Sequence, residues 1–261
     1  MGTYALVTGG TSGIGKAFCF ALAEKGYNLI IVSNNTERLK AIQAELEKKF
    51  ESIKIIIKEC DLRNVKNVYE LCEFCINSHL EINILINNAG FCVWSRFDES
   101  QLNAQLEMLQ LNIASSLILM HSLMPVLEAS PKSYILNVSS TTAFQPVPYV
   151  NLYACSKTFM RNFTMGLRYE MRDKKNLFIS CLSPGATDTN FSERAGFSER
   201  IMKMGKSFSM PADLVAKKGL RGLFANKAEI IPGFLNKLSF YLVHLLPNSL
   251  LIRIAASIYK K

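Results

Sequence analysis

The chain has 261 residues, 49% of them apolar, and a formal charge of +9 at pH 7. This length suits one large α/β domain with a sizeable core, and the lack of long charged or low-complexity blocks argues against disorder. The basic residues are scattered with no run of five, which argues against a nucleic-acid partner and leaves an anionic cofactor or a membrane surface to explain the charge.

Seven cysteines, an odd number spread through apolar segments, predict reduced thiols and a cytoplasmic location. Cys72, Cys75 and His79 fall on one predicted helix, but no second pair of ligands accompanies them, so we expect core thiols and no metal site. Because the first predicted strand begins at Tyr4, we expect no signal or transit peptide.

A strand, a glycine-rich turn and a helix open the chain. Residues 4–8 form a short apolar run, and residues 16–25 carry a helical apolar pattern. Between them stand four glycines, Gly9, Gly10, Gly13 and Gly15. Glycines let the backbone approach a pyrophosphate, and the helix N-terminus faces the anion. The spacing departs from the usual G-x-G-x-x-G, but it favours a phosphate cradle over a plain strand-to-helix turn.

The second predicted strand, residues 28–33, ends where a dinucleotide-binding unit meets the adenosine ribose. An acid there would hold the ribose hydroxyls and repel a 2′-phosphate, but Ser33, Asn34 and Asn35 provide neither an acid nor an arginine. Asn34, with Glu37 three residues later, also fits a capping box for the next helix. A cofactor contact and a helix cap are therefore both open for Asn34.

Two further predicted strands end in polar or small residues. After the third strand, residues 53–58, come Asp61 and Leu62. The Asp61 carboxylate is placed either to accept from an adenine amino group or to stabilise the start of a helix expected over 64–78. The fourth strand, residues 82–86, leads into small and amide side chains that suit close cofactor approach: Asn87, Asn88, Ala89 and Gly90.

The centre of the chain predicts a proton-transfer site. A strand over 134–138 ends at Ser139 and Ser140, and Tyr153 and Lys157 are spaced to share one face of a helix. A phenol with a pKa near ~10 needs a shift of about three units, roughly 4 kcal/mol, to act at neutral pH. One ammonium at about 4 Å supplies that much at an effective dielectric of ~20.

A long apolar helix expected over 101–127 contains Asn112, whose amide needs a partner. A sixth strand, 177–182, precedes a turn that includes Pro184, Gly185, Thr187 and Thr189. Residues 190–210 are interpreted as a mobile insertion, followed by a helix over 211–226 and a short strand over 229–231.

The tail, residues 233–261, is apolar and basic, and its 15-residue run from Leu238 to Ile252 holds no charged residue. This run is interrupted by Pro247 and is shorter than the ~20 residues that span a bilayer. We expect two short amphipathic helices that either pack on the core or on a neighbouring subunit, or lie on a membrane surface.

Six motifs in order resemble the short-chain dehydrogenase/reductase family over about residues 3–232, with the tail as an extension of the same single domain. They are the Thr8-to-Gly15 turn, Asn87-to-Gly90, Asn112, Ser140, Tyr153 with Lys157, and Pro184-to-Thr189. The chain is most similar to the subgroup of microbial carbonyl reductases and 17β-hydroxysteroid or 3-ketoacyl reductases. The resemblance implies a doubly wound, parallel seven-stranded sheet with helices on both faces and hydride transfer between a nicotinamide and a carbonyl or alcohol carbon.

The resemblance also implies roles for individual residues. Tyr153 is the proton donor and acceptor, Lys157 lowers its pKa and holds the ribose, Ser140 polarises the substrate oxygen, and Asn112 supports a water that links Lys157 to solvent. The implied cofactor-binding residues are Gly9, Thr11, Ser12, Gly13, Ile14, Gly15, Asn34, Asp61, Leu62, Asn88, Ala89, Gly90, Tyr153, Lys157, Pro184, Gly185, Thr187 and Thr189.

The missing acid after the second strand favours NADP, with NAD as the alternative. We expect a small hydrophobic ketone or alcohol as substrate and a homodimer or homotetramer. A non-catalytic NAD(P) sensor and a dehydratase or epimerase are the alternative functions on the same fold.

Overall fold

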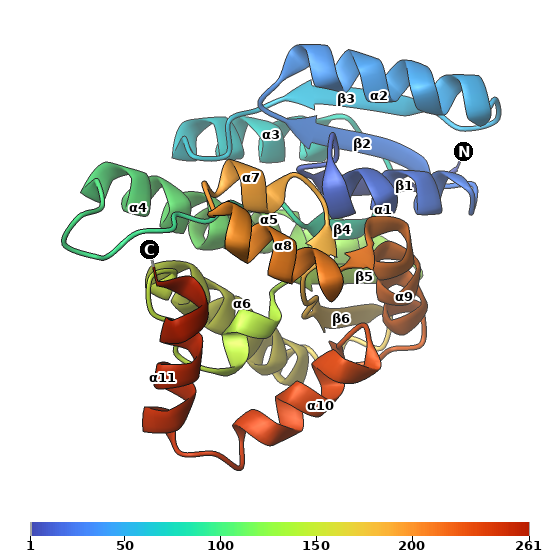
Figure 1. Cartoon of the computed structure of the whole chain (residues 1–261). Helices are drawn as coiled ribbons and strands as arrows, with labels where there is room; N and C mark the ends of the chain where they lie inside the picture. Colours follow the sequence, from blue (N-terminus) through green and yellow to red (C-terminus); the bar gives the residue numbers. More distant parts are fainter. Residues whose placement is uncertain (1, 261) are drawn as a thin grey trace.

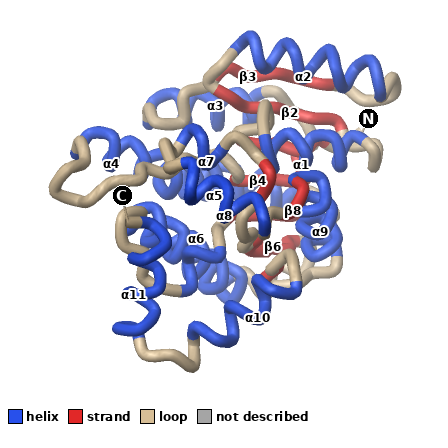
Figure 2. Tube along the Cα trace, viewed as in Figure 1, coloured by secondary structure: helices blue, strands red, loops and turns tan. Residues whose placement is uncertain are grey.

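A parallel sheet of seven strands forms the centre of the protein, which is described here over residues 2–260 of a computed structural model (Figures 1 and 2). The strand order is β3-β2-β1-β4-β5-β6-β9. The strands are β1 Tyr4–Thr8, β2 Asn28–Ser33, β3 Ile55–Glu59, β4 Ile82–Asn87, β5 Ser133–Val138, β6 Leu177–Leu182 and β9 Glu229–Ile230. The predicted doubly wound fold is confirmed, and the strands over 4–8, 28–33 and 177–182 have the predicted bounds.

Helices cover both faces of the sheet. They are α1 Gly13–Ala23, α2 Thr36–Lys49, α3 Val65–Asn77, α4 Leu102–Leu109, α5 Ser115–Ala129, α6 Asn151–Glu170 and α9 Ala212–Phe224. One core joins α1, α2 and α9 to strand residues such as Val7, and the other joins α3, α5 and α6 to residues such as Leu6. Strands buried on both faces read as continuous apolar runs, which is why their bounds were readable from the sequence.

The chain crosses over at β1, which lies between β2 and β4. From β1 it winds through α1 to β2 and β3 on one side, and α3 then carries it back to β4 on the other side. In sheets of this kind ligands bind at the carboxyl ends of the strands where the winding reverses. The polar strand ends predicted from the sequence therefore meet at one edge.

The predicted helix over 101–127 is divided. A π-helical turn, η1 Gln110–Ala114, separates α4 from α5 and contains Asn112. By length and composition the stretch Leu102–Ala129 could cross a membrane. However, Leu119 and Leu123 of α5 are buried in the core under the sheet, as expected for a core helix.

The capping prediction for Asn34 is wrong. Asn35 is the N-cap of α2, because its side chain accepts a hydrogen bond from the Arg38 N–H at 2.8 Å and the helix begins at Thr36. Asn34 is thereby left free to face the ligand edge of the sheet.

Two segments lie beside the sheet's ligand edge. Strands β7 Thr187–Asp188 and β8 Met210–Pro211 pair with each other and bracket α7 Phe191–Arg194 and α8 Glu199–Ser207. The tail forms α10 Phe234–Val243 and α11 Asn248–Tyr259, the two short helices expected on either side of Pro247. Figure 1 shows these helices along the lower margin of the molecule, joined by a turn that extends away from the body.

Candidate active site

The glycine-rich turn after β1 is closed tightly against the start of α1. Gly9 has a φ of 64°, a conformation that favours glycine. A Cβ at Gly15 would lie 2.2 Å from the Gly9 carbonyl oxygen and 2.5 Å from the amide nitrogen of Asn88, so no other residue fits there. The turn and the first N–H groups of α1 therefore lie close together. An anionic group bound at this helix start could accept hydrogen bonds from these N–H groups.

Thr8 and Asn88 join the turn to the end of β4. The Thr8 hydroxyl accepts hydrogen bonds from the N–H groups of Asn88 and Ala89 at 2.9 and 3.0 Å. The Asn88 amide donates in return to the Thr8 carbonyl at 2.9 Å. These bonds hold the ends of β1 and β4 together at the point where the winding reverses.

A cavity of about 520 Å³ extends along this edge. It is lined by 18 of the 20 residues proposed for the site: Gly9, Thr11, Ser12, Gly13, Ile14, Asn34, Asp61, Leu62, Asn88, Ala89, Gly90, Ser140, Tyr153, Lys157, Pro184, Gly185, Thr187 and Thr189. The other two, Gly15 and Asn112, stand behind the lining.

Asn112 positions the backbone beneath the cavity. Its side chain accepts from the Phe91 N–H at 3.1 Å and donates to the Phe91 carbonyl at 3.0 Å and to the Ser156 hydroxyl at 3.1 Å. A Cβ at Gly90 would meet the Asn112 side-chain oxygen at 2.8 Å and the Lys157 ammonium at 3.4 Å. Asn112 and Lys157 therefore converge around Gly90, and the amide has the structural partners that a buried amide needs.

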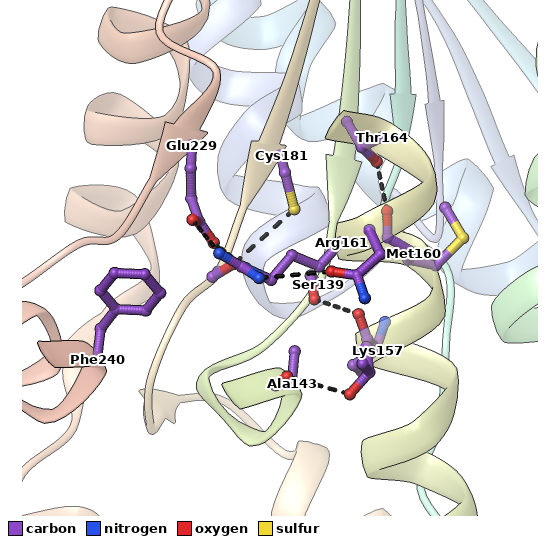
Figure 3. Close-up of polar contacts among 12 residues, drawn as sticks. Ser139, Ala143, Lys157, Met160, Arg161, Thr164, Cys181, Glu229 and Phe240 are labelled. Carbon is purple, nitrogen blue, oxygen red and sulfur yellow. Dashed lines mark hydrogen bonds and ion pairs between the residues drawn. The ribbon is translucent and has the colours of Figure 1, made fainter. Parts of the chain in front are cut away.

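Ser140, Tyr153 and Lys157 meet between β5 and α6. Ser139 donates to the Lys157 carbonyl at 2.7 Å, as Figure 3 shows, so its hydroxyl is bound to the backbone of α6. Ser140 is hydrogen-bonded to Tyr153, which lies on the cavity side of α6 and is 9% exposed. The Lys157 ammonium donates to the Val138 carbonyl at 3.0 Å and lies 5.7 Å from the centre of the Tyr153 ring.

The direction of the Tyr153 shift corrects the sequence-based expectation. Burial raises the pKa of the Tyr153 phenol, the Cys92 thiol adds to the rise, and the hydrogen bond with Ser140 opposes it. Burial also lowers the pKa of Lys157 to about 8. The ammonium does not offset the loss of water around the phenol, because it is directed at a backbone carbonyl. Tyr153 is thus held protonated at neutral pH in the chain alone.

The buried ammonium predicts a pH-dependent stability. Because the pKa of Lys157 falls from 10.5 to about 8 on folding, the unfolded state binds more protons between these values, and stability rises with pH in that window. Between pH 8 and 9.5 we expect the free energy of unfolding of wild type to rise by about 2 kcal/mol relative to that of Lys157→Met. Urea unfolding monitored by fluorescence measures this, with Lys40→Met on exposed α2 as control. A difference that stays constant with pH would contradict the prediction.

Asp61 forms an ion pair at the edge of the cavity that its position in the sequence did not predict. Both of its carboxylate oxygens accept hydrogen bonds from the Arg63 guanidinium, at distances down to 2.6 Å, and these bonds lower the pKa of Asp61. Arg63 also pairs with Glu107 at 2.9 Å. The carboxylate therefore holds Arg63 at the rim of the cavity, which Asp61 itself also lines, so its contact with an adenine amino group stays a prediction.

Two other arginines line the same end of the cavity. Arg38 extends from α2, and Arg194 comes from α7 and donates to the Ser12 hydroxyl at 3.2 Å. Arg194 was not predicted as a site residue. It lies 182 positions from Ser12 in the sequence, and nothing in the local pattern of the insertion distinguishes it from the neighbouring charged residues.

The opposite end of the cavity is aromatic. Phe191 packs on Tyr153 with ring centres 5.7 Å apart, and Phe197 packs on both Trp94 and Tyr259 at 5.8 Å. The Trp94 indole donates to the Tyr259 carbonyl at 2.7 Å, which fixes the end of α11 beside the site. Phe208, near the end of the same insertion, is 68% exposed and is not part of the cavity lining.

The sequence of the chain is similar to those of known proteins. The family model described as short chain dehydrogenase matches residues 3–199. The chain belongs to the short-chain dehydrogenase family. The resemblance inferred from the six motifs is confirmed, and with it an oxidoreductase family whose members bind NAD(P).

Individual members of the family show how far the likeness extends. The chain is 31% identical to rat 17-beta-hydroxysteroid dehydrogenase type 3 over 211 residues, which are 80% of this chain and 67% of that protein. It is 27% identical to a very-long-chain 3-oxoacyl-CoA reductase of Macaca fascicularis over 268 aligned residues, covering all of this chain and 78% of that one.

The fold also matches a solved short-chain dehydrogenase from Sphingobium yanoikuyae in complex with NADPH, with a TM-score of 0.80 and 23% identity over 94% of this chain and 96% of that one. Matches to several hydroxysteroid dehydrogenase relatives cover only 55–67% of those proteins' lengths.

Proposed function

We propose that this short-chain dehydrogenase reduces a bulky hydrophobic ketone, steroid-like or 3-oxoacyl, to the alcohol with NADPH. The observation that carries the proposal is the position of Tyr153, Ser140 and Lys157. They lie between a glycine- and arginine-lined end of one cavity and an aromatic end. The names of the hydroxysteroid and 3-oxoacyl-CoA relatives support the substrate class.

The residues at the ligand edge fit a dinucleotide. The turn closed by Gly15 and the N-terminus of α1 suit a pyrophosphate, and Thr187 and Thr189, which line the same cavity, offer hydroxyls to a carboxamide. When bound, the nicotinamide supplies the hydride. Lys157 is placed to hold the ribose hydroxyls.

The protein itself supplies the proton that the reduction of a ketone needs. A ketone oxygen held between Ser140 and Tyr153 accepts a hydrogen bond from each, and the Tyr153 proton moves to that oxygen as negative charge develops on it. Burial raises the pKa of Tyr153, so the phenol is protonated at neutral pH. Reduction uses the phenol in this protonated state, in which it can donate its proton to the ketone oxygen.

The preference for NADPH rests on the unpaired charge of Arg38 and Arg194. Among residues 2–260, no carboxylate forms an ion pair with either guanidinium. Burial lowers the pKa of Arg194, and repulsion from Arg38 lowers it further. Together with the hydroxyls of Thr11 and Ser33, which are 3.0 Å apart, these groups suit a 2′-phosphate that would relieve the repulsion.

We expect NADPH to bind about 10–100-fold more tightly than NADH, because charge-assisted hydrogen bonds contribute about 1.5–3 kcal/mol each. Arg194→Gln should abolish most of this ratio by weakening NADPH binding alone. Fluorescence titration of both reduced cofactors measures it. Arg63→Gln is the matched control, because Arg63 lines the same cavity but is neutralised by Asp61 and Glu107. Tighter binding of NADH by wild type would refute the preference.

The aromatic end of the cavity supports the proposed substrate class. Phe191, Phe197 and Tyr259 offer apolar rings close to Tyr153 and leave few polar partners for a sugar. A panel of steroid ketones, 3-oxoacyl esters, small diketones and ketoses, assayed by NADPH oxidation, tests this. Preferential turnover of ketoses would overturn the substrate class. It would not contradict the role of Tyr153 as the proton donor.

We also propose a homodimer or homotetramer. Exposed apolar side chains on α4, Leu102 at 62% and Leu106 at 53%, support association through this face. Light scattering of the purified protein measures the mass directly.

A further inference from the structure

The two tail helices expose an apolar surface that water does not favour. Between Phe234 and Ile254, ten large apolar side chains are exposed: Phe234, Leu235, Leu238, Tyr241, Leu242, Leu245, Leu246, Leu250, Ile252 and Ile254. Phe234 is 78% exposed and Leu245 79%. We call these side chains the patch; so many exposed apolar side chains on two consecutive helices indicate an interaction surface.

The patch is on the outward side of helices whose inward side is already occupied. On α10 the half-buried Asn236 and Phe240 lie four residues apart, whereas Phe234, Leu238 and Tyr241 follow the helical period on the opposite side. The outward side of α2, by contrast, carries Glu37 and Lys40, as a helix facing water does. The outer side of α10 is apolar, so it differs from the charged, water-facing outer side of α2.

All charged side chains of the tail are basic. Residues 232–260 contain no Asp or Glu, and their basic residues Lys237, Arg253 and Lys260 flank the apolar run. A symmetric contact between two copies would bring these same cations together without any acid from the tails to pair with them. An anionic lipid surface instead offers both the apolar layer and the opposite charge.

We propose that the outer side of α10 and α11 docks on an anionic lipid bilayer and delivers the lipophilic substrate to the cavity beside it; the delivery step rests on the proposed function. The helices lie on the interface, because a run of this length with an internal Pro247 is too short to cross it.

The inner side of α10 is anchored to the body of the protein. Phe240 packs on Phe144 at 4.9 Å and lies 5.3 Å from the Arg161 guanidinium, which is itself anchored by two hydrogen bonds to Glu229 at 2.6 and 2.7 Å (Figure 3).

At the other end of the tail, Leu251 and Ala255 are buried and Tyr259 lines the cavity. The end of α11 thus forms part of the cavity wall at its aromatic end, while the outer side of the same helix presents Leu250 and Ile254 to the surroundings. The same helix therefore contributes both to the exposed apolar surface and to the wall of the cavity.

Vesicle flotation of the full chain tests the docking. Wild type should float with vesicles of phosphatidylcholine and phosphatidylserine and bind much more weakly to phosphatidylcholine alone or in high salt. Replacing three outward residues, Phe234→Ser, Leu238→Ser and Tyr241→Ser, should abolish flotation. Removing the cations by Lys237→Gln, Arg253→Gln and Lys260→Gln should lower affinity on the order of a hundredfold, about a factor of five per charge.

The matched control is Tyr69→Ser with Ile76→Ser, which removes exposed apolar side chains from α3 and should leave flotation unchanged. Wild type that stays with the soluble fraction at every lipid composition overturns the proposal. So does a dimer, measured by light scattering, that only the outward tail variant converts to monomer, because the surface is then an interface between copies.

A second measurement tests delivery. With vesicles present, the outward tail variant should lose at least tenfold in turnover of a membrane-partitioned ketone and keep its rate with a water-soluble ketone. Equal loss on both ketones overturns delivery. Flotation needs no turnover, so a protein that floats but reduces no ketone would refute the proposed function and leave docking supported.

Discussion

Tyr153→Phe is expected to lower turnover by at least ~10²–10⁴-fold, the usual contribution of a positioned general acid. The substitution removes only the hydroxyl, and the ring keeps its packing on Phe191 at 5.7 Å. The cavity wall stays in place, so NADPH should bind within about threefold of wild type, a change below ~1 kcal/mol. Steady-state rates and cofactor titration on the same preparation measure both effects.

Tyr259→Phe is the matched control for this experiment. Tyr259 lines the same cavity and burial raises its pKa as well, but its place is at the aromatic end, and Ser140 and Lys157 lie beside Tyr153 instead. The rate of Tyr259→Phe should remain within tenfold of wild type. If Tyr153→Phe retained turnover within tenfold, another group would be the proton donor, and the assignment of Tyr153 would be wrong.

Much of the frame could be predicted because its signals are local. The apolar strands are continuous in sequence, the turn glycines stand together, and Tyr153 and Lys157 share one helical face through their spacing. The two tail helices followed from Pro247 and the flanking apolar runs.

The failures have physical reasons that spacing does not contain. The direction of the Tyr153 shift depends on burial and on the aim of the Lys157 ammonium at Val138. The ion pair of Asp61 with Arg63 was also missed, because it depends on the side-chain rotamers of both residues.

Long-range contacts are the other part that sequence patterns missed. Arg194 reaches Ser12 only because the insertion folds over the turn after β1. The π-helical turn around Asn112 likewise depends on its amide being drawn to the Phe91 backbone, since the surrounding residues form a regular helical pattern. Tertiary contacts of this kind override what local propensity predicts.

Gly15→Ala is expected to destroy cofactor binding through a single methyl group. The added Cβ would lie 2.2 Å from the Gly9 carbonyl oxygen, which is backbone and has no rotamer by which to retreat. The turn and α1 must then separate by about 1 Å or more, a displacement that costs on the order of 10²-fold at a positioned site. We expect NADPH affinity to fall at least ~100-fold and the free energy of unfolding to fall by about 1–3 kcal/mol from overpacking.

Gly166→Ala shows whether the effect belongs to the turn. Gly166 lies inside α6 with open space where a Cβ would be, so the same substitution should raise the free energy of unfolding by roughly 0.5–1 kcal/mol and leave NADPH binding unchanged. Cofactor titration and urea unfolding of the two variants give a paired comparison. The added methyl group must separate the turn from α1. If Gly15→Ala nevertheless bound NADPH as tightly as Gly166→Ala, the close packing of the turn on α1 would not be required to hold the pyrophosphate.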